Sequence, residues 1–199
     1  MAVVFSNGTA TVLPIQPGYF GLVEVEDARV SSISFETTRY PLSKTSTFAN
    51  MTRAVAGAVS RAGLLTELAS DESGWSGTPS LEELLYDPTI AIYAAYAYEL
   101  AGSGGADRIY KALLNTGHMA SMPFDIALLA GELEWRGRTA VAPACPMLSV
   151  GWSLLDSYAR LPDWPLDLKT LAARRLPAEW TTFRADDITR YASLFEEGL

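Results

Sequence analysis

The sequence has few of the side chains that most often carry out chemistry. Its 199 residues include a single cysteine, Cys145, and a single histidine, His118. One cysteine excludes a disulfide within the chain. Low cysteine content is typical of proteins from a reducing cytoplasm, so we expect this protein to act in the cytoplasm. Because a metal site needs three or four suitable ligands, we expect no metal and no other cofactor.

The chain also lacks a long hydrophobic run and a concentration of positive charge. Its longest apolar stretch, residues 87–100, is about fourteen residues and too short to cross a bilayer. Residues 1–8 lack the basic start and the long apolar run of a signal peptide. The formal net charge is −8, and the three lysines and twelve arginines are dispersed. Phosphate backbones and anionic membrane surfaces are repelled by that charge, so we expect neither nucleic acid nor a membrane as a partner.

Apolar residues, by contrast, are plentiful at 49% of the chain. That share is enough for a full core and indicates a folded chain. The first forty residues predict strands. Asn7-Gly8 is a strong hairpin signal between residues 3–5 and 9–15. Residues 19–26 and 29–36 alternate between apolar and polar side chains around a turn at 26–28. We therefore predict a small antiparallel β-meander with one solvated face over residues 1–42.

After residue 43 the apolar residues recur with a helical period. The most strongly predicted helix covers residues 88–100, with Asp87 as its N-cap and Pro88 at its first position. This helix is apolar nearly all round, which is typical of a central helix buried on several sides. Ser80 and Glu83 predict a capping box at the start of the preceding short helix.

Other helices are predicted around this central one. The helix expected to end near residue 62 has an apolar stripe, and further helices are expected over 106–115, from 123 to about 137, from 146 onward, over 166–174 and over 187–197. The stripe residues of the first are Phe48, Met51, Val55 and Val59. No fixed period recurs, so a repeat array is excluded. The predicted fold is α+β: the meander of residues 1–42 and a compact, mostly α-helical array over 43–199, together forming one integrated domain.

Cys145 and His118 are the one possible cysteine-type pair of nucleophile and base, and their order along the chain is that of caspase-like peptidases. The local sequence argues against that role. His118 follows a helix without a preceding apolar strand, and Cys145 lies between Pro143 and Pro146. A thiol at the start of a helix can have a lowered pKa. The structural interpretation, a polar histidine at a helix end and a half-buried thiol, is favoured, and a cysteine hydrolase is the alternative.

Two short motifs imitate functional loops. Residues 74–77, Gly-Trp-Ser-Gly, resemble a nucleophile elbow, but the second glycine comes one place early and no strand leads into the motif. Residues 102–105, Gly-Ser-Gly-Gly, resemble a phosphate-binding loop, but they follow a helix and lack the basic residue and the third spaced glycine. Both are predicted to be connecting segments.

The aromatic residues offer binding surfaces instead of catalytic groups. Trp164, in a proline-flanked segment, and Trp75, in a polar loop, are the candidate partner-binding residues. The tyrosines of the central helix, Tyr93, Tyr96 and Tyr98, could line a pocket for a small molecule, which gives a third possible function.

Several segments, taken in order, are familiar as a set. They are residues 12–19 followed by the hairpin of 25–30, residues 87–98, residues 124–130 and residues 142–152. Together they resemble an uncharacterised accessory region found downstream of caspase-like or trypsin-like peptidase domains in bacterial proteins, some from defence loci. The resemblance spans most of the chain, and its motifs are structural. Its hairpin usually has glycine where this chain has Ala28.

The resemblance implies a non-catalytic module that acts near a protease. We therefore expect a protein-interaction or regulatory module of a bacterial proteolytic system, with antiviral defence as one setting, that is a regulator or a target of a caspase-like protease. Its expected partner is a protease or another domain of a longer polypeptide. The alternatives are a cysteine hydrolase that uses Cys145 and His118, and a small-molecule binding domain with a tyrosine-lined pocket.

Overall fold

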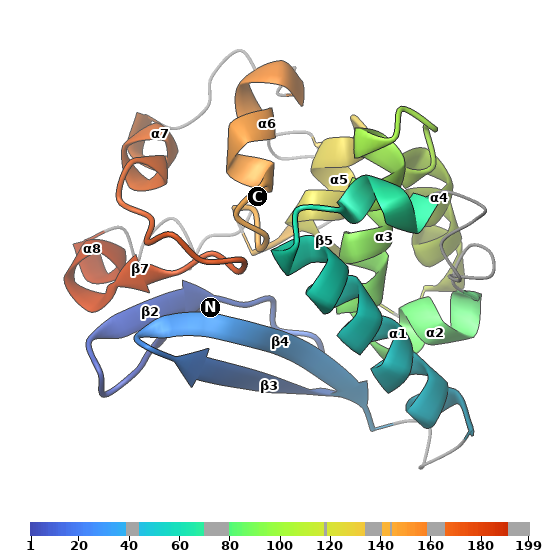
Figure 1. The fold of residues 1–199 in the computed structure, drawn as a ribbon, viewed down its shortest axis with the longest axis horizontal. Helices are drawn as coiled ribbons and strands as arrows, with labels where there is room; N and C mark the ends of the chain where they lie inside the picture. Colours follow the sequence, from blue (N-terminus) through green and yellow to red (C-terminus); the bar gives the residue numbers. More distant parts are fainter. Residues whose placement is uncertain are drawn as a thin grey trace. The chain divides into compact units, whose positions relative to one another are not determined.

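The computed structural model describes residues 1–38, 44–69, 80–117, 119–133, 141–143, 145–158 and 166–190 (Figure 1). The fold is α+β, as predicted, with antiparallel strands at the N-terminus and helices along most of the remainder. The chain divides into two compact units. Unit 1 comprises Met1–Ile15, Val23–Ser32 and Ser121–Leu199, and unit 2 comprises Gln16–Leu22 and Ile33–Ala120. The boundary that we predicted at residues 42/43 lies outside the described residues.

The sheet of unit 1 begins with the predicted hairpin. Strand β1 (Ala2–Val4) pairs antiparallel with β2 (Thr9–Val12), and the turn between them places Gly8 in the left-handed region at φ 82°. The side chain of Asn7 accepts hydrogen bonds from the backbone N–H and the hydroxyl of Thr9, at 3.0 and 2.6 Å. The second neighbour of β2 is β7 (Phe183–Arg184), which comes from the other end of the chain and which the sequence did not predict.

The helical part of unit 1 contains α5 (Phe124–Leu129), α6 (Gly151–Tyr158), α7 (Leu166–Ala172) and α8 (Ala185–Arg190), with a short parallel pair of strands, β5 (Met122–Pro123) and β6 (Val141–Ala142). Two predicted helix boundaries are wrong by five residues or more. The helix that we expected to reach residue 137 ends at Leu129, because Gly131 adopts a left-handed conformation at φ 69°. The helix that we expected from residue 146 begins at Gly151.

A buried carboxylate explains the late start of α6. Asp125 on α5 is fully buried and accepts hydrogen bonds from the backbone N–H groups of Met147 and Leu148, at 2.8 and 3.2 Å. Leu148 also forms a β-bridge with Trp180. These tertiary contacts hold the backbone at 147–148 in a non-helical conformation, so the helix can begin only after them.

Unit 2 is built around α3 (Pro88–Leu100), the predicted central helix. Every residue from Pro88 to Ala97 is buried. The N-cap prediction is confirmed, since the side chain of Asp87 accepts a hydrogen bond from the N–H of Thr89 at 2.9 Å. Around α3 lie α1 (Lys44–Arg61), the 3₁₀ helix η1 (Leu65–Ala69), α2 (Leu81–Tyr86) and α4 (Ala106–Thr116). The capping box of Ser80 and Glu83 at the start of α2 is also confirmed.

The residues of the second hairpin are divided between the two units. Strands β3 (Tyr19–Glu26) and β4 (Arg29–Thr37) form their own two-stranded sheet, so the predicted N-terminal strands are distributed over two sheets. Asp27 and Ala28 in the connecting turn both have positive φ, at 48° and 58°, which is the conformation of a tight hairpin turn. Residues 19–22 and 33–37 belong to unit 2, and the residues nearer the turn belong to unit 1. Within the described ranges, no helix is long and apolar enough to span a membrane.

Candidate functional site

One exposed surface of the described chain is a row of large apolar side chains on α1. Phe48, Met51 and Val55 expose 58%, 62% and 51% of their surface. Their spacing of three and four residues places them on one side of the helix. Single exposed apolar residues are ordinary, whereas a row of them marks a contact surface. We call these three residues the α1 apolar row.

The opposite side of α1 explains why the row faces solvent. Ala49, Ala56 and Gly57 are buried, and a Cβ atom added to Gly57 would lie 3.4 Å from the hydroxyl oxygen of Tyr93 on α3. Small residues on this side therefore allow α1 and α3 to approach closely. The sequence period correctly grouped the apolar residues, but it is the small residues of α1 that face the core.

Polar contacts fix the same orientation. The guanidinium of Arg53 donates a hydrogen bond to the carboxylate of Asp87 at 2.7 Å, and the hydroxyl of Thr52 donates to Glu83 at 3.1 Å. Rotating α1 to bury its apolar row would break both contacts. It would also leave the charge of Asp87, which is fully buried, without its cationic partner.

Asp87 is the common anchor of unit 2. Its carboxylate accepts hydrogen bonds from the N–H of Phe35 in β4 at 3.2 Å, from the N–H and hydroxyl of Thr89 at 2.9 and 2.7 Å, and from Arg53. Burial raises the pKa of Asp87 above its ordinary value, while the hydrogen bonds from Thr89 and the charge of Arg53 act in the opposite direction. One side chain thus links β4, α1 and α3.

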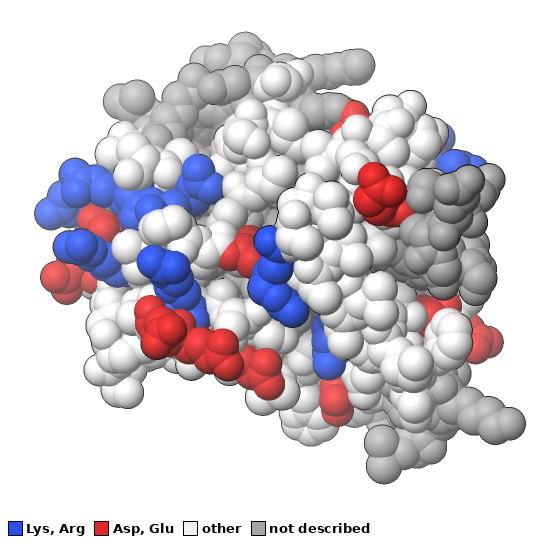
Figure 2. Space-filling model, in the orientation of Figure 1, with Lys and Arg blue, Asp and Glu red and all other residues white. Residues whose placement is uncertain are grey.

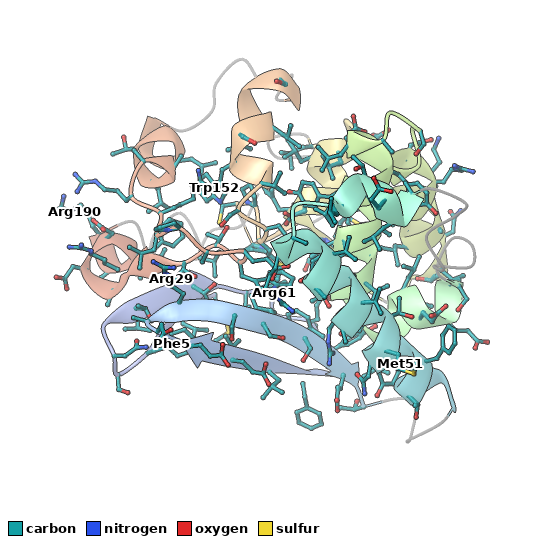
Figure 3. All side chains as sticks on the ribbon, in the orientation of Figure 1. Phe5, Arg29, Met51, Arg61, Trp152 and Arg190 are labelled. Carbon is teal, nitrogen blue, oxygen red and sulfur yellow. The ribbon has the colours of Figure 1, made fainter. Side chains whose placement is uncertain are left out.

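The charges of α1 differ from those of the chain as a whole. Residues 44–61 contain the basic residues Lys44, Arg53 and Arg61 and no acidic residue, although the net charge of the protein is −8. Figure 2 shows a broad uncharged surface over α1. In Figure 3, Met51 lies on the first half of the helix and Arg61 at its C-terminal end. The charged residues of α1 are therefore all basic.

Cys145 lies in unit 1 in an environment that does not favour reactivity. Its side chain is fully buried, and it does not open a helix, since α6 begins six residues later at Gly151. Burial, and after it the negative charge of Asp125, raises the pKa of the Cys145 thiol well above its ordinary value. The half-buried thiol that we expected is therefore wholly buried. His118, its possible partner, lies outside the described residues.

This environment predicts slow chemistry at Cys145. Because the thiolate is the reactive form, we expect iodoacetamide at pH 7.5 to modify Cys145 in the folded protein at least about 100-fold more slowly than in urea-unfolded protein. Intact-mass spectrometry over time measures both rates. Rapid modification of the folded chain would contradict the buried position and would revive the hydrolase interpretation.

The other predicted site residues divide into two groups. Trp164 and Trp75 lie outside the described residues, and their role in partner binding stays a prediction. Tyr93 and Tyr96 are buried in the interior of unit 2, and Tyr98 is partly buried. No group of three or more His, Cys, Asp or Glu side chains in the described part of the chain could hold a metal ion.

Tyr98 has a structural role that can be tested. A Cβ atom added to Gly105, at the start of α4, would lie 2.4 Å from Cγ and 2.8 Å from Cβ of Tyr98. We expect Gly105→Ala to lower the free energy of unfolding by about 1–3 kcal/mol through overpacking, measured by urea denaturation. The same substitution in a Tyr98→Ala background is the control, because the ring that the new Cβ would meet is then gone. An equal loss in both backgrounds would contradict the explanation.

Comparison with known proteins adds no family assignment. No protein-family model matches the sequence, and neither the curated proteins nor the solved structures contain a match to it. The resemblance to the accessory region of peptidase-containing proteins therefore stays a prediction from the sequence.

Proposed function

We propose that this chain is a non-catalytic protein-interaction module and that the α1 apolar row is its contact surface. The observation that carries the proposal is the exposure of Phe48, Met51 and Val55 on one side of a helix whose opposite side is held by small residues and by Asp87. Aromatic residues and methionine are enriched where proteins bind one another. Covering the exposed half of each side chain would stabilise a complex by on the order of 1 kcal/mol per residue.

The setting of this activity rests on the sequence resemblance alone. On that basis we propose that the module belongs to a cytoplasmic proteolytic system in bacteria, with antiviral defence as one setting. In that system it would be a regulator or a target of a caspase-like protease. Its partner is then the protease or a further domain of a longer polypeptide.

Two observations weigh against the alternative functions. A catalytic cysteine needs access to substrate and a stabilised thiolate, whereas Cys145 is buried and its pKa is raised. A ligand pocket lined by the tyrosines of α3 needs rings that reach open space, whereas Tyr93 and Tyr96 are buried. The burial of Cys145 therefore weighs against the cysteine hydrolase, and the burial of Tyr93 and Tyr96 weighs against the tyrosine-lined pocket.

The proposal is tested by capture from the native host. Affinity-tagged full-length chain is mixed with a host extract, and retained proteins are identified by mass spectrometry. We expect a protein retained by the wild type to be lost with Met51→Glu, because the new carboxylate would be buried without a partner. Leu114→Glu, which changes an exposed leucine on α4, is the matched control and should retain the protein.

Each outcome separates a different part of the proposal. If the wild type retains nothing beyond a tag-only sample, the chain is not an interaction module under these conditions and the proposal is wrong. If Met51→Glu retains the same proteins as the wild type, binding uses a surface other than α1.

A further inference from the structure

We propose that the open edge of β3 is a further binding surface, which takes an extended protein segment as an added strand. The segment is apolar where it runs beside Phe20 and Leu22, and basic where it runs beside Glu24 and Glu26. The proposal goes beyond the interaction through α1, because it concerns a different element and does not depend on the α1 apolar row.

The backbone of β3 has unpaired groups along one edge. In the described chain β3 pairs with β4 alone, which lies along its other edge (Figure 1). Because the turn between the strands has two residues, Glu26 and Arg29 pair through their backbone groups, and the groups of every second residue of β3 face β4. The N–H and C=O groups of Gly21, Val23 and Val25 therefore point to the open edge. An exposed edge of this kind is where an extended segment can add to a sheet.

The strand lacks most of the features that protect edge strands from pairing. Natural edge strands are often very short or carry proline or lysine. The eight residues of β3 include neither proline nor lysine. Two large apolar side chains at its start are exposed, Phe20 at 72% and Leu22 at 59%. Side chains on the same face of neighbouring strands contact one another, so an added strand with apolar residues at these positions would cover both.

The second half of the strand indicates the charge of the segment. Glu24 and Glu26 are exposed, and in the described structure neither carboxylate takes part in a hydrogen bond or an ion pair. Arg29, across the turn from Glu26, is exposed and is not paired with it. Figure 2 shows acidic side chains in a row over this hairpin. Lysine or arginine directly across from these two glutamates would form favourable cross-strand pairs.

A second copy of the chain fits this edge less well. Two β3 strands related by a two-fold axis would pair antiparallel, with the same side chains facing each other's edge. In both registers that overlap most of the strand, Phe20 of one copy lies beside Glu24 or Glu26 of the other. The acidic residues of both copies would also meet on one face, where like charges destabilise the pairing. A different segment, with basic residues, avoids both conflicts.

The test begins with selection of binding segments by the full-length chain from a phage library of random short peptides. We expect the enriched peptides to carry apolar residues at alternate positions in one half and lysine or arginine at alternate positions in the other. An enriched peptide is then synthesised with a fluorescent label, and its Kd for the full-length chain is measured by anisotropy.

Variants of β3 test the edge and the charge separately. Val23→Pro removes a donor of the open edge and none that faces β4, so we expect the hairpin to persist and Kd to rise at least about 10-fold. Val25→Pro acts in the same way and is the second variant, and circular dichroism shows which of the two is folded. Glu24→Lys should raise Kd several-fold. Glu82→Lys on α2 is the matched control, since it reverses another exposed carboxylate and should leave Kd unchanged.

Hydrogen exchange followed by NMR detects the added strand without any substitution. The amides of Gly21, Val23 and Val25 should exchange at least about 10-fold more slowly with the peptide bound, because they gain hydrogen-bond acceptors. The amides of Leu22 and Glu24, which face β4, are the internal control and should change little.

Each contrary result would overturn the inference. The contrary results are the absence of enriched peptides, enriched peptides without basic residues, unchanged exchange at the three edge amides, and an unchanged Kd in the folded proline variants or in Glu24→Lys. Loss of peptide binding with Met51→Glu would place the peptide on the α1 apolar row, which overturns this inference and leaves the proposed function standing. A dimer of the free chain that dissociates with Val23→Pro would assign the edge to a second copy instead.

Discussion

Asp87→Ala is expected to lower the free energy of unfolding by about 3–5 kcal/mol, since it removes one partner of a buried ion pair and leaves other buried groups unsatisfied. The substitution takes away the N-cap of α3, the partner of Arg53 and the acceptor for the N–H of Phe35 in one step. Urea denaturation followed by circular dichroism measures the loss. Asp107→Ala is the control, because Asp107 forms an exposed pair with Lys111 that contributes less than about 1 kcal/mol. Similar losses for the two variants would contradict the central role of Asp87.

Asp87→Asn isolates the charge from the hydrogen bonds. Asparagine keeps a side-chain oxygen that can accept from Thr89, so we expect a smaller loss than with alanine. Burial raises the pKa of Asp87, so the folded protein takes up a proton at a higher pH than the unfolded chain does. The wild type should therefore gain stability relative to Asp87→Asn as the pH falls through the raised pKa, down to the unfolded value of ~3.9. If the wild type instead loses stability relative to Asp87→Asn as the pH falls, the effect of the Arg53 charge on the pKa of Asp87 outweighs that of burial.

Asp125→Ala is expected to have the next largest effect, a loss of about 2–4 kcal/mol. The fully buried carboxylate accepts from the backbone N–H groups of Met147 and Leu148, and alanine would leave both donors without it. Denaturant unfolding gives the total loss, and hydrogen exchange at residues 147 and 148 shows whether it arises there. Asp125→Asn keeps one acceptor oxygen and should lose less. Unchanged exchange at these two amides would contradict this explanation.

The features that the sequence predicted well are those determined by a few neighbouring residues. Asp87 with Pro88 specifies the start of α3, and Ser80 with Glu83 specifies the start of α2. Asn7-Gly8 likewise defines a turn through its own backbone preference. In each case the hydrogen-bond donor and its acceptor lie within three residues of each other, so a short stretch of sequence is enough to predict the contact.

The features that the sequence did not predict depend on distant partners. The start of α6 is displaced by Asp125, more than twenty residues away, and β7 pairs with a strand at the opposite end of the chain.

The α1 apolar row is a different case. Helical period shows which residues share a side, but it does not show which side meets the core. For α1 that choice is made by Gly57, by the small residues beside it and by the contact of Arg53 with Asp87. Gly57, a small residue in the middle of the helix, was the available signal, because it permits the close approach of another helix.

The sharing of β3 and β4 between the two units has a practical consequence for truncation. Both strands pass from one unit to the other, and unit 1 is assembled from three separate stretches of sequence. A fragment that stopped at residue 120 would keep β2 but lose β7, so one edge of β2 would be left open for pairing with another chain. A fragment that began at residue 33 would lose the partner strand of β4. We therefore expect neither fragment to fold on its own, so the roles of individual residues are better tested by point substitution than by deletion.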